Sequence, residues 1–98
     1  MFIGTLKIEI IIPGSNSLKD KRKIISSLQG KIKSKFNVSI AEIDYQDKWQ
    51  RAVIGLCCVN SEKNEVEEIL QKIRNIFFEN GDVLVLNETN EVIYIGEK

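Results

Sequence analysis

RAVIGLCCV, residues 51–59, is the stretch that decides the fold of this chain of 98 residues. It is a short apolar run bounded by polar segments, which is typical of a buried strand. Apolar side chains occupy both sets of alternating positions, so we expect a central strand with both faces covered. Cys57 and Cys58 within it are interpreted as two small buried hydrophobic residues rather than as a disulfide, because strand neighbours point to opposite faces.

Strand and helix patterns alternate on both sides of this stretch. Ser17 and Asp20 have the spacing of a capping box, and apolar residues then recur at helical spacing as far as Phe36. A second helix with an apolar stripe follows Asn60 or Ser61, either of which could cap it. The predicted elements are a strand over 2–12, a helix from Ser17 to Phe36, strands over 38–43 and 51–59, a helix closed at 80–82, and a strand over 83–86.

The segment after residue 86 has two interpretations. Residues 92–95 again have a strand pattern, after a polar run over 87–91. They could form a short extra strand that folds back, or a bulged extension of the C-terminal strand. Either way, we predict that 1–98 is one domain.

The order βαββαβ predicts an α+β, ferredoxin-like split sandwich. With right-handed crossovers, its antiparallel sheet has the strand order 4-1-3-2, and both helices lie on one face. Three connections then meet at one end of the sheet: residues 14–22, 44–51 and 80–82. Loops that converge on a rigid scaffold are where function is commonly found.

Composition excludes several classes of chemistry. The chain has no histidine and no glycine-rich phosphate loop, and its cysteines lack a second pair for a zinc site or disulfide framework. We therefore expect no enzyme activity, no metal and no cofactor. The apolar N-terminus is interrupted by Lys7 and Glu9, which argues against a signal peptide or membrane span.

Charge is divided unevenly between the two parts of the chain. Residues 1–41 hold eight Lys and Arg against two Asp and Glu, whereas residues 42–98 hold six against twelve. Cations in the first turns of the first helix oppose its dipole, so helix stability alone would not select them. The candidate phosphate- or RNA-binding residues share the outer face of that helix with Ser26 and Gly30: Lys19, Arg22, Lys23 and Lys33. The alternative is an ordinary solvated lysine-rich face.

Lys21 differs from its neighbours because it projects toward the apolar side of the helix. We predict that it reaches the end of the second and third strands and pairs with Glu42, Asp44 or Asp47. Glu42 and Asp44 share one face of a strand, but two carboxylates near lysines are more often ion-pair partners than an acid–base pair.

The polar hairpin over residues 44–51 holds the second group of candidates. Trp49 is expected either to fold back as a lid on the core, which is the more common outcome, or to be exposed for recognition. Gln46, Gln50 and Arg51 offer hydrogen-bonding groups without an evident local partner. The candidate recognition residues of this hairpin are therefore Gln46, Trp49, Gln50 and Arg51.

Several stretches together resemble the YlxP-like family of small uncharacterised bacterial proteins. They are Phe2-Ile3-Gly4, Ser17-Leu18-Lys19-Asp20-Lys21-Arg22, Lys35-Phe36-Asn37-Val38-Ser39, residues 41–52 and Ile54-Gly55. The resemblance covers residues 1–86 and implies a ferredoxin-like fold in a cytoplasmic bacterial protein. Members of this family tend to be encoded beside translation initiation factor two and ribosome-binding factor A, which implies a role near RNA or ribosome assembly. The family supplies no catalytic residues to carry over.

Two functions are compatible with these observations. The first is a non-enzymatic RNA- or ribosome-associated binding module that uses the basic helix and the neighbouring hairpin. The alternative is a homodimeric protein-interaction or regulatory module that uses the open face of the sheet. On that face we expect Thr5, Lys7 and Glu9 beside part of the third strand's apolar surface.

Overall fold

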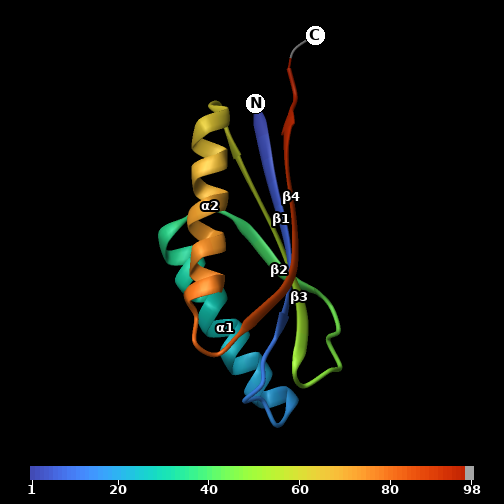
Figure 1. Ribbon diagram of the computed structural model, residues 1–98. Coiled ribbons are helices and arrows are strands. Elements are labelled where there is room, and N and C mark those ends of the chain that lie inside the picture. The colour runs from blue at the N-terminus through green and yellow to red at the C-terminus, as the bar shows by residue number, and fades with distance from the viewer. Residues whose placement is uncertain (97–98) are drawn as a thin grey trace.

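A computed structural model describes residues 1–96. The chain runs β1 (Phe2–Ile11), α1 (Leu18–Lys35), β2 (Ser39–Asp44), β3 (Arg51–Asn60), α2 (Lys63–Glu79) and β4 (Leu84–Tyr94). The four strands form one antiparallel sheet with the order β2-β3-β1-β4, and both helices lie on one side of it (Figure 1). This confirms the ferredoxin-like split sandwich and its strand order.

The core lies between the helices and the sheet. Alternate residues of β1 (Leu6, Ile8 and Ile10) point toward the helices and are almost completely buried. Gly4 continues this inward row where α2 comes closest, because a Cβ atom there would lie 2.4 Å from Cγ1 of Val66. The missing side chain lets α2 pack directly against β1.

The position of β3 is as predicted, but the covering of its two faces is not. β3 lies between β2 and β1, inside the sheet. However, Val59 is 60% exposed and Cys57 is also exposed, so the expectation that both faces are covered is wrong. The physical reason is that both helices pack on the same face and leave the other face open (Figure 1). Thr5, Lys7 and Glu9 lie on this open face.

The C-terminal segment is one long strand. β4 pairs with β1 along its whole length, with an irregularity where Glu9 pairs with Asn87 and Ile10 pairs with Val85. Leu86 is the extra residue at this β-bulge. The structure therefore selects the bulged extension over the extra strand, while residues 97–98 lie outside the described residues.

The helix ends follow local hydrogen bonding. Ser17 caps α1 and accepts the Asp20 N–H at 3.0 Å, as the sequence predicts. Neither Asn60 nor Ser61 caps α2, which begins after Glu62; the side chain of Asn60 instead accepts the Glu62 N–H at 2.9 Å. Within the described residues, no helix has both the length and the apolar composition that a bilayer crossing needs.

Candidate nucleic-acid interface

Gln50 joins two of the three connections at one end of the sheet. Its side-chain Nε2 donates to the carbonyl oxygens of Pro13 at 3.2 Å and Ser15 at 2.9 Å, while its own carbonyl accepts the Ile12 N–H at 2.9 Å. The β2–β3 hairpin is thereby fixed to the loop that leads into α1. The sequence shows no local partner for Gln50, and the carbonyls that it binds come from residues more than 30 positions away in the chain.

Lys21 makes the second connection between α1 and the hairpin. Its side chain is almost completely buried, and its Nζ donates to the carbonyls of Tyr45 at 2.7 Å and Arg51 at 3.2 Å, with Gln46 O at 3.4 Å. Of the three expected acidic partners, Glu42 is the one in contact, with its Oε2 2.8 Å from Nζ. The three carbonyls accept the hydrogen bonds that the Lys21 ammonium donates, so its contact with Glu42 is mainly an electrostatic attraction between the two charges.

Arg51 is held by a residue that the sequence does not suggest as its partner. Its Nε donates to Glu9 Oε2 at 2.6 Å, and its guanidinium lies 4.4 Å from the centre of the Tyr45 ring. The hydrogen bond that Arg51 donates to Glu9 raises the pKa of Arg51 above its usual value. Arg51 is therefore not the unpartnered group that the sequence suggests. Pairing of β1 with β3 brings Glu9 to it, which a linear pattern does not show.

Tyr45 has the only positive φ among non-glycine residues in the described part of the chain, at 60°. This left-handed conformation costs an L-residue roughly 1–2 kcal/mol. Three contacts hold it there: its N–H donates to Asp44 Oδ1 at 2.8 Å, and its carbonyl accepts from Lys48 N at 3.0 Å and from Lys21. The left-handed conformation turns the Tyr45 carbonyl inward, where it accepts a hydrogen bond from the buried ammonium of Lys21.

Trp49 is 55% exposed, so the expectation of a lid on the core is wrong. The inner side of the hairpin is already occupied by Lys21, whose ammonium binds the hairpin carbonyls. The indole instead borders an open hollow of about 500 Å³. This hollow is lined by Ile11, Tyr45, Lys48, Trp49, Gln50 and Arg51.

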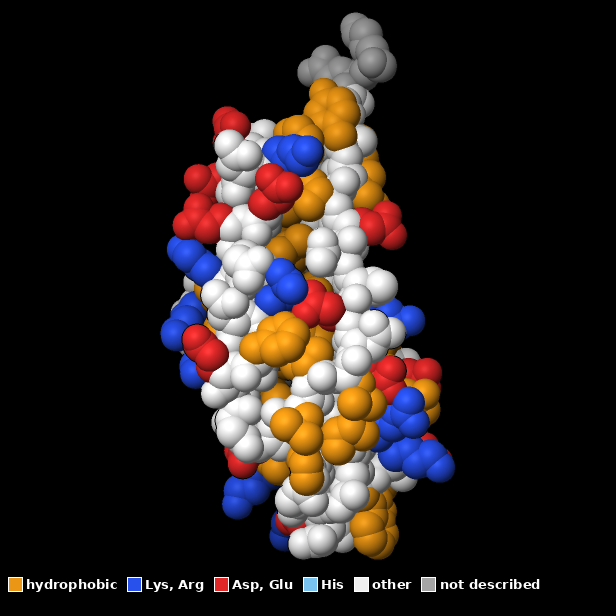
Figure 2. Space-filling model, in the orientation of Figure 1, with side chains coloured by type: hydrophobic (Ala, Val, Ile, Leu, Met, Phe, Trp, Pro, Cys, Tyr) orange, Lys and Arg blue, Asp and Glu red, His pale blue; other side chains and the backbone are white. Residues whose placement is uncertain are grey.

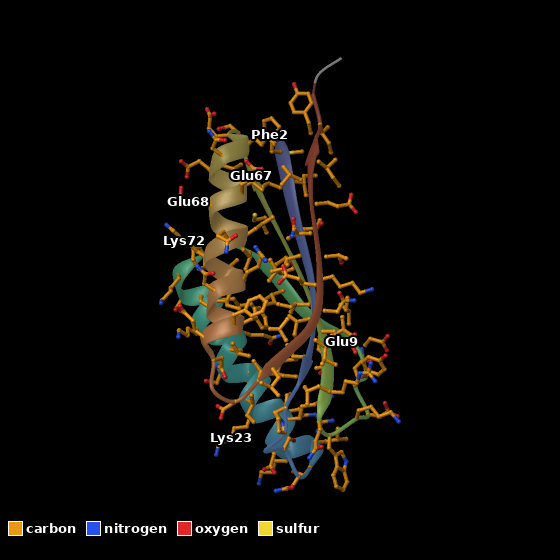
Figure 3. The ribbon with its side chains drawn as sticks, in the orientation of Figure 1. Phe2, Glu9, Lys23, Glu67, Glu68 and Lys72 are labelled. Atoms are coloured by element: carbon orange, nitrogen blue, oxygen red, sulfur yellow. The ribbon has the colours of Figure 1, made fainter. Side chains whose placement is uncertain are left out.

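The basic residues at the start of α1 lie beside this hairpin. Lys19, Arg22 and Lys23 are exposed, and none of them has an ion-pair partner within the described residues. Figure 3 shows Lys23 pointing away from α1 into solvent near this end of the molecule. Lys33 is also exposed but lies fourteen residues further along the helix than Lys19, or about 21 Å. Lys33 therefore belongs to the opposite end of the helix.

The N-terminus of α1 is not an open anion site. Ser17 Oγ accepts the Asp20 N–H, and Asp20 Oδ2 accepts the Asn16 N–H at 3.0 Å. A phosphate at this end would therefore be bound by the lysine and arginine side chains rather than by the first amides of the helix.

The remaining candidate residues contribute less to this end. Gln46 and Asp47 are exposed, and neither side chain has a hydrogen bond or ion pair in the described part of the chain. The third connection, residues 80–82, makes no hydrogen bond to the other two connections within residues 1–96. No cluster of three or more His, Cys, Asp or Glu suited to a metal ion occurs among the described residues.

Comparisons with solved structures show the fold alone. Two designed proteins are similar to the chain. The first, Foldit4, has a TM-score of 0.54 and 11% identity, and the match spans 98% of this chain and 100% of Foldit4. The solution structure of the design LFR1 1, described as having a ferredoxin fold, has a TM-score of 0.51 and 10% identity. This match spans 100% of the chain described here and 91% of the LFR1 1 chain.

Comparisons of sequence identify the family. The "Uncharacterized protein YlxP" of Bacillus subtilis (strain 168) is 42% identical over 71 residues, which is 72% of this chain and 77% of that protein. The family described as "Protein of unknown function (DUF503)" matches residues 3–89. The predicted resemblance is confirmed, and the chain belongs to this family of YlxP-like proteins.

Proposed function

We propose that this protein is a non-enzymatic, cytoplasmic RNA- or ribosome-binding module whose contact surface is the end of the molecule formed by α1 and the β2–β3 hairpin. One observation carries the proposal. The exposed indole of Trp49 lies on a hairpin that Gln50 and Lys21 fix to the start of α1, where exposed cations have no ion-pair partner among residues 1–96.

The two parts of this surface suit the two parts of a nucleotide. Three cations supply positive charge for phosphates without first breaking an ion pair to any residue that the structure describes: Lys19, Arg22 and Lys23. Trp49 offers a flat aromatic face on which an unpaired base can stack, and stacking of this kind tolerates any base. Binding to single-stranded or loop RNA with low sequence specificity is therefore the activity that this surface supports best.

The sheet is less suited to the same task. RNA-binding sheets of this fold stack bases on aromatic residues of the two central strands. Here β3 has no aromatic residue, and Phe2 of β1 is partly buried and packs on Tyr94 with ring centroids 4.9 Å apart. The hairpin and helix end thus offer the better contact surface.

Filter binding with ribosomal RNA tests the proposal. The Lys19→Glu/Arg22→Glu/Lys23→Glu variant should lose most of its affinity, and the wild-type affinity should fall steeply with salt. If three phosphates are contacted, log K against log salt should have a slope of about −2 for single strands.

The matched control is Lys31→Glu/Lys35→Glu/Lys63→Glu, which changes the net charge by the same amount at exposed residues away from the hairpin. It should retain most of the affinity. Equal affinity of the wild type and the first variant would overturn the proposal, and so would an equal loss in both variants.

A further inference from the structure

We propose that two copies of this chain associate through β4. The β4 strand of one copy pairs antiparallel with the β4 strand of the other about a two-fold axis at Thr89, which joins the two sheets into one. This inference concerns a different surface from the proposed RNA-binding end. It rests on the open edge of β4, on the order of its side chains and on the apolar residues around it.

β4 is the longer of the two open edges of the sheet. It pairs with β1 on one side only, and its 11 residues make it almost twice as long as β2, the 6-residue strand at the other edge. Edge strands of monomeric proteins are usually kept short or carry lysine, proline, a bulge or an inward-pointing charge, which oppose pairing with another chain. β4 contains no lysine or proline, but it carries the bulge at Leu86 and the inward-pointing Glu88, whose charge is paired with Arg74 of α2. The regular stretch from Asn87 to Tyr94 is therefore the part of this edge whose outer N–H and C=O groups can pair with a second chain.

The sequence of β4, LVLNETNEVIY, has a near-symmetric pattern about Thr89, with three apolar residues, five polar residues and three apolar residues. In antiparallel pairing about Thr89, the regular part of β4 opposes Asn87 with Glu91, Glu88 with Asn90 and Thr89 with Thr89. Because Leu86 is the extra residue at the bulge, the register beyond it places Val85 opposite Val92 and Leu84 opposite Ile93, so that apolar residues again lie opposite apolar ones.

Neighbouring registers are worse. Moving the axis to Glu88 places that carboxylate opposite its own copy, and moving it to Asn90 places Glu88 opposite Val92. Like charges directly opposite each other destabilise a strand pair. Thr89 is therefore the register that avoids facing carboxylates and keeps polar residues opposite polar ones. It also keeps the helices of both copies on one face of the joined sheet, because directly opposed residues share a face.

Exposed apolar side chains lie along the same edge. Leu84, Leu86 and Tyr94 of β4 are each more than half exposed, and so is Phe78 of α2. Arg74 donates to Glu88 of β4, and Phe78 follows Arg74 by one helical turn, so Phe78 lies on the β4 side of α2. Figure 2 shows apolar side chains gathered between α2 and β4 on the face in view. A second copy seated on this edge would cover them.

A cysteine at the axis tests the register. In a Cys57→Ser background, which removes the exposed native thiol, Thr89→Cys places two cysteines directly opposite each other. Strand partners at this spacing fall within the range that a disulfide spans, so mild oxidation should give a covalent dimer. In the matched variant Glu91→Cys, the two thiols are offset by four residues, or about 13 Å, and should not cross-link. Absence of the Thr89 dimer, or equal cross-linking of both variants, would overturn the proposal.

Charge at the neighbouring position tests the association without a cross-link. Light scattering of the wild type should give twice the chain mass of 11.2 kDa at high protein concentration. Asn87→Lys, opposite Glu91 of the second copy, should lower the Kd by about 2- to 30-fold, and Asn87→Glu should raise it by a similar factor. The same changes at Ser39, on the β2 edge, should leave the Kd unchanged. A wild type that stays at 11.2 kDa would overturn the proposal, and so would an equal Kd for Asn87→Lys and Asn87→Glu.

Discussion

The Nζ atom of Lys21, on α1, lies 2.8 Å from Oε2 of Glu42, on β2, and the same ammonium binds the carbonyls of Tyr45 and Arg51. One buried side chain thus connects the start of the helix to both strands of the hairpin. Among the closely spaced cations of α1, Lys21 is the one committed to the fold. Its neighbours remain available for a ligand.

Lys21→Met should destabilise the protein strongly. The change leaves the hairpin carbonyls without their donor and Glu42 without its counter-ion, and breaking such a buried pair costs about 3–5 kcal/mol. Urea unfolding followed by circular dichroism measures this loss. Lys23→Met, two residues away and exposed, should change the free energy of unfolding by no more than about 0.5 kcal/mol. A similar midpoint for both variants would show that Lys21 does not hold the hairpin.

Trp49→Ala should separate binding from stability. Because the indole is more than half exposed, its removal should leave the free energy of unfolding within about 0.5 kcal/mol of the wild type. The free energy of binding to single-stranded RNA should become less favourable by about 1–3 kcal/mol if a base stacks on the ring, and Trp49→Phe should restore part of this loss. Loss of folding cooperativity in Trp49→Ala would instead indicate a structural role for the ring.

The two adjacent cysteines should react differently. Cys57 is exposed and Cys58 is buried, so a thiol reagent should modify one thiol in the native protein and two after unfolding. Burial raises the pKa of Cys58, and a backbone hydrogen bond at Gly4 opposes this only in part. Rapid native labelling of both thiols would contradict the assignment.

The same shift predicts a pH dependence of stability. Above the ordinary thiol pKa of 9.0, the unfolded chain releases the Cys58 proton while the folded chain retains it, so stability falls as pH rises. The wild type should lose stability more steeply than Cys58→Ala between about pH 8 and pH 10. Chemical denaturation at each pH measures both slopes, and parallel slopes would contradict the prediction.

Two glycines should respond to alanine in opposite ways. Gly4→Ala places a Cβ atom against Val66, so overpacking should cost about 1–3 kcal/mol unless Val66→Ala makes room. Gly30, in the middle of α1, has open space around its missing side chain. Gly30→Ala should therefore stabilise the protein by about 0.5–1 kcal/mol. Thermal unfolding of the two single variants and the Gly4→Ala/Val66→Ala pair measures all three changes.

Local patterns in the sequence predicted most of the fold and the course of Lys21. Strand alternation, the Ser17 cap and the helical stripes depend on neighbouring residues, and the lysine stood out because it broke one of those stripes. The partners of Gln50 and Arg51 depend instead on strand register and loop path, which bring together residues far apart in the chain. The exposure of Trp49 follows from what occupies the space beneath the hairpin, and no single-sequence pattern reports that.

The exposed position of Trp49 also gives the protein its own optical reporter. It is the single tryptophan of the chain, and its indole already contacts water in the folded state. Its fluorescence should therefore report quenching by a stacked base at the hairpin without background from the core. For the same reason it should be an insensitive probe of unfolding, because denaturation changes the solvent around this ring less than it would around a buried one.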